Sequence, residues 1–194
     1  MAISLVKGQK ISLEKTAGST LTRVIMGLGW DAKKKGGFMG MFQTDQEIDL
    51  DASCVMFSAT GDVVDTVWFR QLKSKDGSIV HTGDNRTGAG DGDDEQIIVE
   101  LDKIPGGVKH LVFVVNSFTG ITFDQIDNAF CRLVDTKTSK EVAKFELGGS
   151  GKHTAQVMVR LHRESDGWQM HAIGEKATGR TYEDLLPVIK PHLT

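Results

Sequence analysis

The segment from His81 to Glu95, HTGDNRTGAGDGDDE, combines the residue types best suited to binding a hard cation. It contains five carboxylates, one asparagine and four glycines. Ca²⁺ takes about six to eight oxygen ligands, and glycine lets backbone carbonyls turn toward an ion. Carboxylates this close together repel each other unless a cation compensates them. The segment therefore predicts one half of a calcium site, carried on a loop.

A second acidic segment is the expected other half. Asp45-x-Glu47-x-Asp49-x-Asp51 places alternating acids on one side of the chain where a strand begins. Gly27-Leu-Gly-Trp30-Asp31 offers a further carboxylate on a loop, with Trp30 anchored in the core. A single charge run is usually a solvated surface, so an acidic hairpin loop that binds nothing remains an alternative. Two converging sets of acids favour a binding site.

Simpler motifs do not account for the acidic loop. Asp84 to Glu95 has the length of an EF-hand loop, but Arg86 and Gly88 occupy ligand positions and Ala89 replaces the turn glycine. A phosphate-binding loop would need a Lys-Ser/Thr ending, which is missing. The sequence also contains no Gly-x-Ser-x-Gly elbow and no His-Glu-x-x-His zinc motif.

Composition indicates a soluble globular protein. The chain has 194 residues, of which 39% are hydrophobic and 25% charged, and this predicts a single domain over residues 1–194. A net charge of −3 argues against general affinity for nucleic acid. No apolar run reaches the roughly 18 residues of a membrane span, so we expect a cytoplasmic location. Cys54 and Cys131, far apart in apolar surroundings, are expected to be reduced core thiols, with a single disulfide as the alternative.

Short runs with period-two hydrophobicity, separated by turn residues, predict an all-β sandwich of two mostly antiparallel sheets. In Ile48–Ser58, for example, the residues Ile48, Leu50, Ala52, Cys54 and Met56 share one face. The expected strands are 48–58, 63–69, 78–83, 96–101, 108–117, 130–135, 141–147, 153–164 and 168–175. A short inserted helix and a C-terminal helix complete the predicted fold.

Local signals place the two helices and one hairpin. A capping box at Thr122–Gln125 predicts a short helix over 122–129, and Thr181–Asp184 caps the C-terminal helix. An Asp166-Gly167 turn would set His162 opposite His171 across a hairpin.

The segment Lys33–Phe42, KKKGGFMGMF, begins two residues after Asp31 and joins three cations to four large apolar side chains. Positive charge attracts anionic lipid or an acidic partner, and methionine adapts to irregular surfaces. The alternative is that the apolar side chains fold back onto the core. We expect calcium to order this segment for docking on a partner or a membrane surface. The candidate docking residues are Lys33, Lys34, Lys35, Phe38, Met39, Met41 and Phe42.

Several motifs together resemble the TerD family of tellurium-resistance and stress-response proteins. They are GLGWD (27–31), DLDAS (49–53), the acidic loop (81–95), VNSF (115–118), AFCRLVD (129–135) and WQMHAIG (168–174). The resemblance spans nearly the whole chain. The segment Lys33–Phe42 is most similar to the TerZ branch, in which a glycine-rich apolar insertion follows the GWD motif.

This resemblance implies a calcium-binding β-sandwich with no established catalytic activity, so we do not expect an enzyme. It also implies a role in resistance to tellurite and other chemical stress, with other stress or tellurite-resistance proteins as partners, some at the inner membrane surface. Ala89 occupies a position where many relatives have Glu, so one carboxylate of the family motif is missing. The residues that match the motif, and that would hold one or two Ca²⁺ ions, are Asp31, Asp49, Asp51, Asp84, Asn85, Asp91, Asp93, Asp94 and Glu95.

Two other functions compete with this prediction. Clustered carboxylates can hold paired Mg²⁺ or Mn²⁺ ions in a phosphoesterase, although Arg86 is the only basic residue of the loop that could bind a phosphate. A calcium-bridged glycan binder would need an aromatic platform beside an exposed ion, whereas Trp30 and Trp68 are expected in the core.

Overall fold

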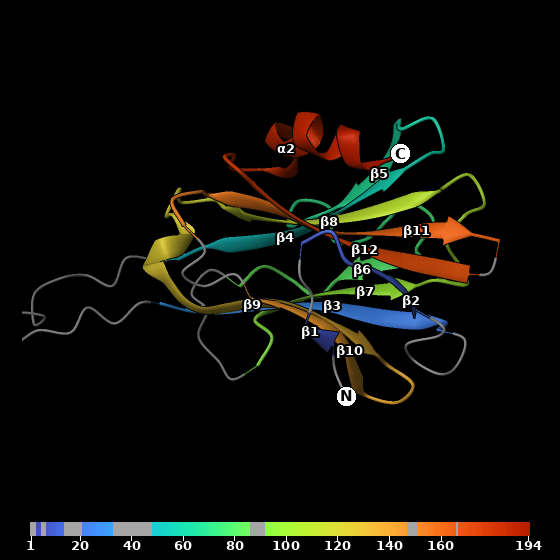
Figure 1. Cartoon of the computed structure of the whole chain (residues 1–194), viewed down its shortest axis with the longest axis horizontal. Coiled ribbons are helices and arrows are strands. Elements are labelled where there is room, and N and C mark those ends of the chain that lie inside the picture. The colour runs from blue at the N-terminus through green and yellow to red at the C-terminus, as the bar shows by residue number, and fades with distance from the viewer. Residues whose placement is uncertain are drawn as a thin grey trace, which may run out of the picture.

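Two six-stranded β-sheets pack face to face and enclose the hydrophobic core (Figure 1). The computed structural model describes residues 3–4, 7–13, 21–32, 48–85, 92–146, 151–165 and 167–194. In spatial order the first sheet contains β1 (Ile3–Ser4), β10 (Lys140–Glu146), β9 (Ile126–Asp135), β3 (Arg23–Ala32), β7 (Glu95–Glu100) and β6 (Ile79–His81). The second contains β2 (Lys10–Ser12), β12 (Gly167–Ala177), β11 (Ala155–Glu164), β8 (His110–Ser117), β4 (Leu50–Phe57) and β5 (Val63–Val67).

Strand pairing is antiparallel throughout the two sheets except between β1 and β10. The predicted all-β sandwich of mostly antiparallel sheets is therefore confirmed. Cys54 and Cys131 are both free and buried, as expected. Among the described residues, no helix is long and apolar enough to span a bilayer.

Strand β4 is buried along its whole length because both of its faces are covered. Leu50, Ala52, Cys54 and Met56 belong to the core between the sheets, as their alternation predicted. Val55 and Phe57, on the opposite face, belong to a second apolar cluster under the C-terminal helix. Strand β8 is covered in the same way.

Helix α2 (Tyr182–Ile189) lies across the outer face of the second sheet (Figure 1) and continues into the 3₁₀ turn η3 (Lys190–His192). Leu185 and Ile189 are its buried anchors. At its start, the Asp184 carboxylate accepts hydrogen bonds from the backbone N–H groups of Arg180 and Thr181. The predicted cap at Thr181–Asp184 is thus confirmed.

Two local predictions are wrong. The inserted helix is only the 3₁₀ turn η2 (Phe123–Gln125), and β9 begins directly after it. The Thr122 hydroxyl donates to the Asp124 side chain, so it does not cap a longer helix. In the β11–β12 hairpin Glu164 pairs with Gly167, so the turn lies one residue earlier than expected and His162 faces Gln169, not His171.

Strands β1, β2 and β3 were not predicted, and Gly27–Asp31 was expected on a loop. The structure corrects this: Gly27–Asp31 lies within β3, between β7 and β9. Glycine is unfavourable in strands unless another group approaches closely, and here one does. A Cβ atom on Gly29 would come within 2.4 Å of the Gly92 carbonyl oxygen. The docking segment Lys33–Phe42 lies outside the described residues.

Replacing Leu185 by alanine should loosen α2. The side chain is fully buried, and truncating a buried leucine typically costs about 2–5 kcal/mol. The urea unfolding midpoint should therefore fall well below that of the wild type, while Leu186→Ala, at a partly buried position, should lower it less. Equal midpoints for the two variants would contradict this packing of α2.

Candidate metal centre

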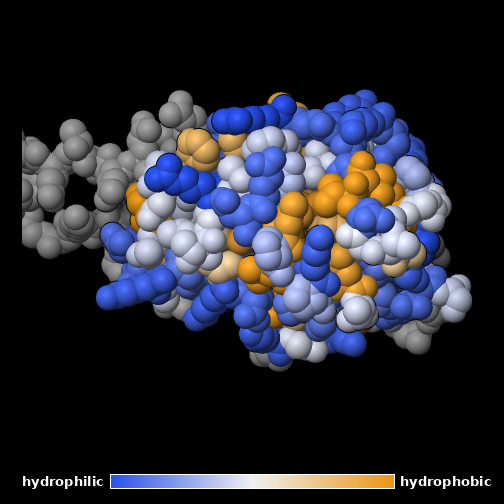
Figure 2. Space-filling model, turned by 90° about the horizontal axis from the view of Figure 1, so that it is seen from above, coloured by the Kyte–Doolittle hydropathy of each residue, from blue (hydrophilic) through white to orange (hydrophobic). Residues whose placement is uncertain are grey.

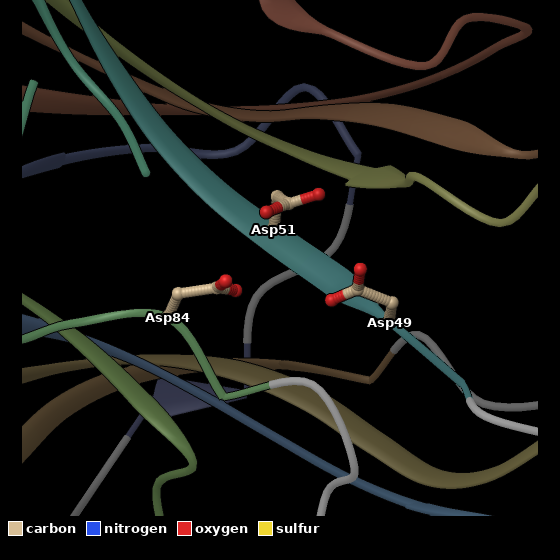
Figure 3. Close-up of side chains that lie close together, drawn as sticks. All are labelled: Asp49, Asp51 and Asp84. Carbon is tan, nitrogen blue, oxygen red and sulfur yellow. The ribbon is translucent and has the colours of Figure 1, made fainter. Parts of the chain in front are cut away.

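Three aspartates meet at one end of the sandwich, where β4 extends beyond β5. Asp49 precedes β4, Asp51 is its second residue, and Asp84 lies on the segment after β6. One carboxylate oxygen from each lies within 4.8 Å of the other two (Figure 3). Asp49 and Asp51 are only 8% and 4% exposed, whereas Asp84 is exposed. The cluster is therefore enclosed on the β4 side and reaches solvent at Asp84.

Asp51 is the electrostatic centre of this cluster. Burial, followed by the charges of Glu95, Asp49 and Asp84, raises its pKa from 3.8 to about 8. Its Oδ2 atom is buried and accepts no hydrogen bond within the described part of the chain. A buried carboxylate oxygen is normally satisfied by donors or by a cation. A divalent cation among these acids would supply both the missing partner and the missing positive charge.

Glu95 crosses from the first sheet to the second. Its Oε2 accepts the Ala52 N–H at 2.9 Å, and its Oε1 accepts the Asn85 N–H at 3.1 Å. Ala52 lies where β4 has no β5 partner, so Glu95 satisfies an edge N–H group that a neighbouring strand would otherwise bind. Glu95 thereby fixes the distance between β4 and the acidic loop.

The buried His81 ring lies against the Glu95 carboxylate. Its Nδ1 accepts the Gly83 N–H, so a neutral ring carries its proton on Nε2, which lies 3.4 Å from Glu95 Oε2. The side chain is fully buried. His81 belongs to the acidic segment 81–95, but its residue type alone predicted no role for it.

Asp94 lies between the aspartate cluster and a second group of acids. Its Oδ2 accepts the Trp30 N–H at 2.9 Å and its Oδ1 accepts from the Asn85 side chain at 3.0 Å. Burial is the largest cause of its raised pKa; the Trp30 hydrogen bond opposes the shift, and Asp31, Glu95 and Asp93 add to it. The structure thus brings Asp31 close enough to act on Asp94.

Asp31 and Asp93 have partners of their own. Exposed Asp31 accepts a hydrogen bond from Asn128 at 2.7 Å. Asp93 forms an ion pair with Arg132 Nε at 2.7 Å and accepts from Gln96 at 3.0 Å. Asp93 is therefore already compensated by a guanidinium and is not part of the three-aspartate cluster. Asp91 lies outside the described residues.

Trp30 ties the two acidic segments together. It is 2% exposed, as expected, and its indole Nε1 donates to the Ile48 carbonyl at 3.0 Å. Trp68, by contrast, is only partly buried, in edge-to-face contact with Phe69 and Tyr182. Its predicted place in the core is therefore corrected to a partly open aromatic cluster beside α2.

The family model of the TerD domain matches residues 1–185. The chain belongs to the TerD family. Tellurium resistance protein TerZ of Serratia marcescens is 48% identical over 184 residues, or 94% of each chain. Stress response protein SCP2 of Bacillus subtilis (strain 168) is 39% identical over 96% of this chain and 98% of its own.

A crystal structure with the same fold is that of a homologue of telluride resistance protein (TerD) from Streptomyces coelicolor A3(2). Its TM-score is 0.69 at 21% identity, over 90% of this chain and 98% of that one. The resemblance that the motifs indicated, to TerD proteins and to TerZ among them, is confirmed.

The metal-free protein should lose stability as the pH rises. Between pH 3.8 and about 8 native Asp51 keeps a proton that the unfolded chain releases, so the stabilisation is complete below pH 3.8 and is lost as the pH rises through about 8. For one fully linked proton the slope is roughly 1 kcal/mol per pH unit. Urea unfolding of chelator-treated protein from pH 5 to 8 should show that the free energy of unfolding falls less steeply with pH in Asp51→Asn than in the wild type. Parallel curves would refute the assignment to Asp51.

Adding a methyl group at Gly29 should displace the acidic loop. The new Cβ would meet backbone at Gly92, which cannot rotate away as a side chain can. We expect Gly29→Ala to cost about 1–3 kcal/mol in urea unfolding. Gly106→Ala is the matched control because a Cβ atom at Gly106 would meet nothing within 4 Å. If both variants unfold at the wild-type midpoint, the close approach of β3 to the loop is wrong.

Proposed function

We propose that this protein is a calcium-binding, non-catalytic interaction module that acts in a tellurite-resistance and chemical-stress response in the cytoplasm. The observation that carries the proposal is the buried Asp51, surrounded by the charges of Glu95, Asp49 and Asp84. Membership of the TerD family, whose members include proteins named for tellurium resistance and for stress response, supports the biological role.

The donor set favours calcium. The converging groups are carboxylates, with the Asn85 amide beside them, and hard oxygen donors suit Ca²⁺ or Mg²⁺ better than zinc or copper. Calcium tolerates irregular geometry and larger coordination numbers, which fits acids contributed by separate segments. We propose Asp49, Asp51 and Asp84 as the ligands of one ion. Asp94 and Asp31, with Asp91 from the same motif, are the candidates for a second.

Calcium would act by joining segments that are distant in sequence. The docking segment Lys33–Phe42 begins two residues after Asp31. The described chain resumes at Ile48, after residues 43–47, and the Ile48 carbonyl accepts a hydrogen bond from the Trp30 indole. Both ends of the segment therefore connect to acids of the candidate centre. We propose that calcium fixes these ends and so presents the segment to a stress-response partner or to the membrane surface.

The competing activities receive less support. Among the described residues, which do not include Arg86, the basic side chains that contact acids of the centre are His81 and Arg132, and each is already paired with a carboxylate. A phosphoesterase needs a cation that can receive the substrate phosphate, and within the described residues neither is available for it. Trp30 is buried and gives no platform for a sugar ring.

Calorimetry should detect calcium binding with a dissociation constant of about 10⁻⁷–10⁻⁵ M, the range of calcium sensors. At a hundredfold excess over this constant, calcium should stabilise the fold by about 2.7 kcal/mol. Asp51→Asn should weaken binding by more than about tenfold, because removing a ligand costs at least as much as removing a group behind it. Asp102→Asn, which neutralises an exposed acid elsewhere, should leave binding unchanged.

No binding heat and no calcium-dependent shift in melting would refute the proposal. Mn²⁺-dependent hydrolysis of a phosphodiester that Asp51→Asn abolishes would instead support the phosphoesterase.

A further inference from the structure

Asn116, near the end of β8, is a buried polar residue with one unsatisfied atom. Register places it directly opposite Asp51 of β4, and directly opposed residues of an antiparallel pair point to the same face of the sheet. Asn116 is 1% exposed. Its Oδ1 is buried and accepts no hydrogen bond from any described residue. Its Nδ2 donates to the Thr181 carbonyl at 3.2 Å.

Two buried oxygen acceptors without donors, Asn116 Oδ1 and Asp51 Oδ2, thus lie on neighbouring strands and on one face. An unsatisfied buried polar atom costs about 1–3 kcal/mol, so adjacent ones point to a common partner. A cation serves two acceptors at once. Amide oxygens are ordinary calcium ligands, so Asn116 fits the same ion as Asp51.

We propose that Asn116 completes the metal centre with its Oδ1 and, through its Nδ2, transmits occupancy of the centre to helix α2. This inference rests on the proposed binding of calcium. The two halves of one amide group then do two different tasks: the oxygen faces the ion, and the nitrogen holds the residue that precedes the helix.

The contacts beyond Asn116 lead directly into α2. Thr181 immediately precedes the helix, and its N–H is bound by the Asp184 carboxylate. One turn of α2 later, Leu185 is packed into the outer apolar cluster. An ion that fixes the Asn116 side chain would fix the Thr181 carbonyl, and with it the start of the helix.

The surface affected is the face of the molecule that carries α2. Figure 2 shows this face from above, with hydrophobic patches among hydrophilic side chains. Calcium would therefore change the order of a helix on an exposed and chemically mixed surface.

Amide hydrogen exchange of residues 181–189, measured with calcium and with chelator, tests the coupling. In the wild type, calcium should slow exchange in this stretch several-fold. Asn116→Ala removes both tasks, so calcium affinity should fall by about 10–100-fold and the helix should no longer respond to the ion. Asn116→Asp keeps an oxygen ligand but loses the donor to Thr181, so calcium should bind more tightly while the helix fails to respond.

Thr154→Val is the matched control. Thr154 and Gly179 exchange hydrogen bonds, so this variant should speed exchange before α2 in both states. Its calcium affinity should equal that of the wild type, and calcium should still slow amide exchange over residues 181–189. If wild type binds calcium but Asn116→Ala binds it equally well, the role of Asn116 as a ligand is refuted. If calcium does not slow amide exchange over residues 181–189 in the wild type, the coupling is refuted. Slowing by calcium in Asn116→Asp would refute it as well. A wild type that binds no calcium would refute the proposed function itself.

Discussion

The packing of several carboxylates into one end of a β-sandwich is the constraint on which this structure depends. The acids lie where β4 continues past the end of β5, so the edge of β4 is open and its N–H groups need acceptors. Glu95, from the opposite sheet, takes the place of the missing strand by accepting the Ala52 N–H. The open edge of β4 thus brings Glu95 close to the other acids. Their mutual repulsion destabilises the folded protein.

The structure divides these acids into two kinds. Glu95, Asp93 and Asp94 are held by fixed donors, namely backbone amides, the Asn85 side chain and the Arg132 guanidinium. Asp51 keeps a buried oxygen for which the described chain provides no donor. Acids of the first kind shape the loop, and the cluster around Asp51 is suited to bind an ion. The described residues of the motif therefore differ in the donors that surround each one.

Residue patterns predicted the sandwich well and the site only in part. Alternation in β4 predicted its core face correctly because Asp51 and Ser53 make the opposite face polar at the start of the strand. Strand β3 was missed because its glycines resemble a loop, and the close approach of Asp93 to Gly27 and of Gly92 to Gly29 explains them. The two acidic segments were found from charge, but the tasks of His81 and Asn116 depend on cross-strand neighbours that one sequence does not reveal. The position of a hairpin turn, one residue from that expected, likewise changed the partner of His162.

The bond between Glu95 and Ala52 also has a kinetic consequence. It joins residues 43 positions apart and forms only when the two sheets have docked. Repulsion among the acids therefore develops only once the sheets have docked, and an ion that needs all of them would bind only the docked sandwich. Such an ion would leave the folding rate nearly unchanged and would slow unfolding. Its contribution would be persistence of the folded state, measured as a lifetime.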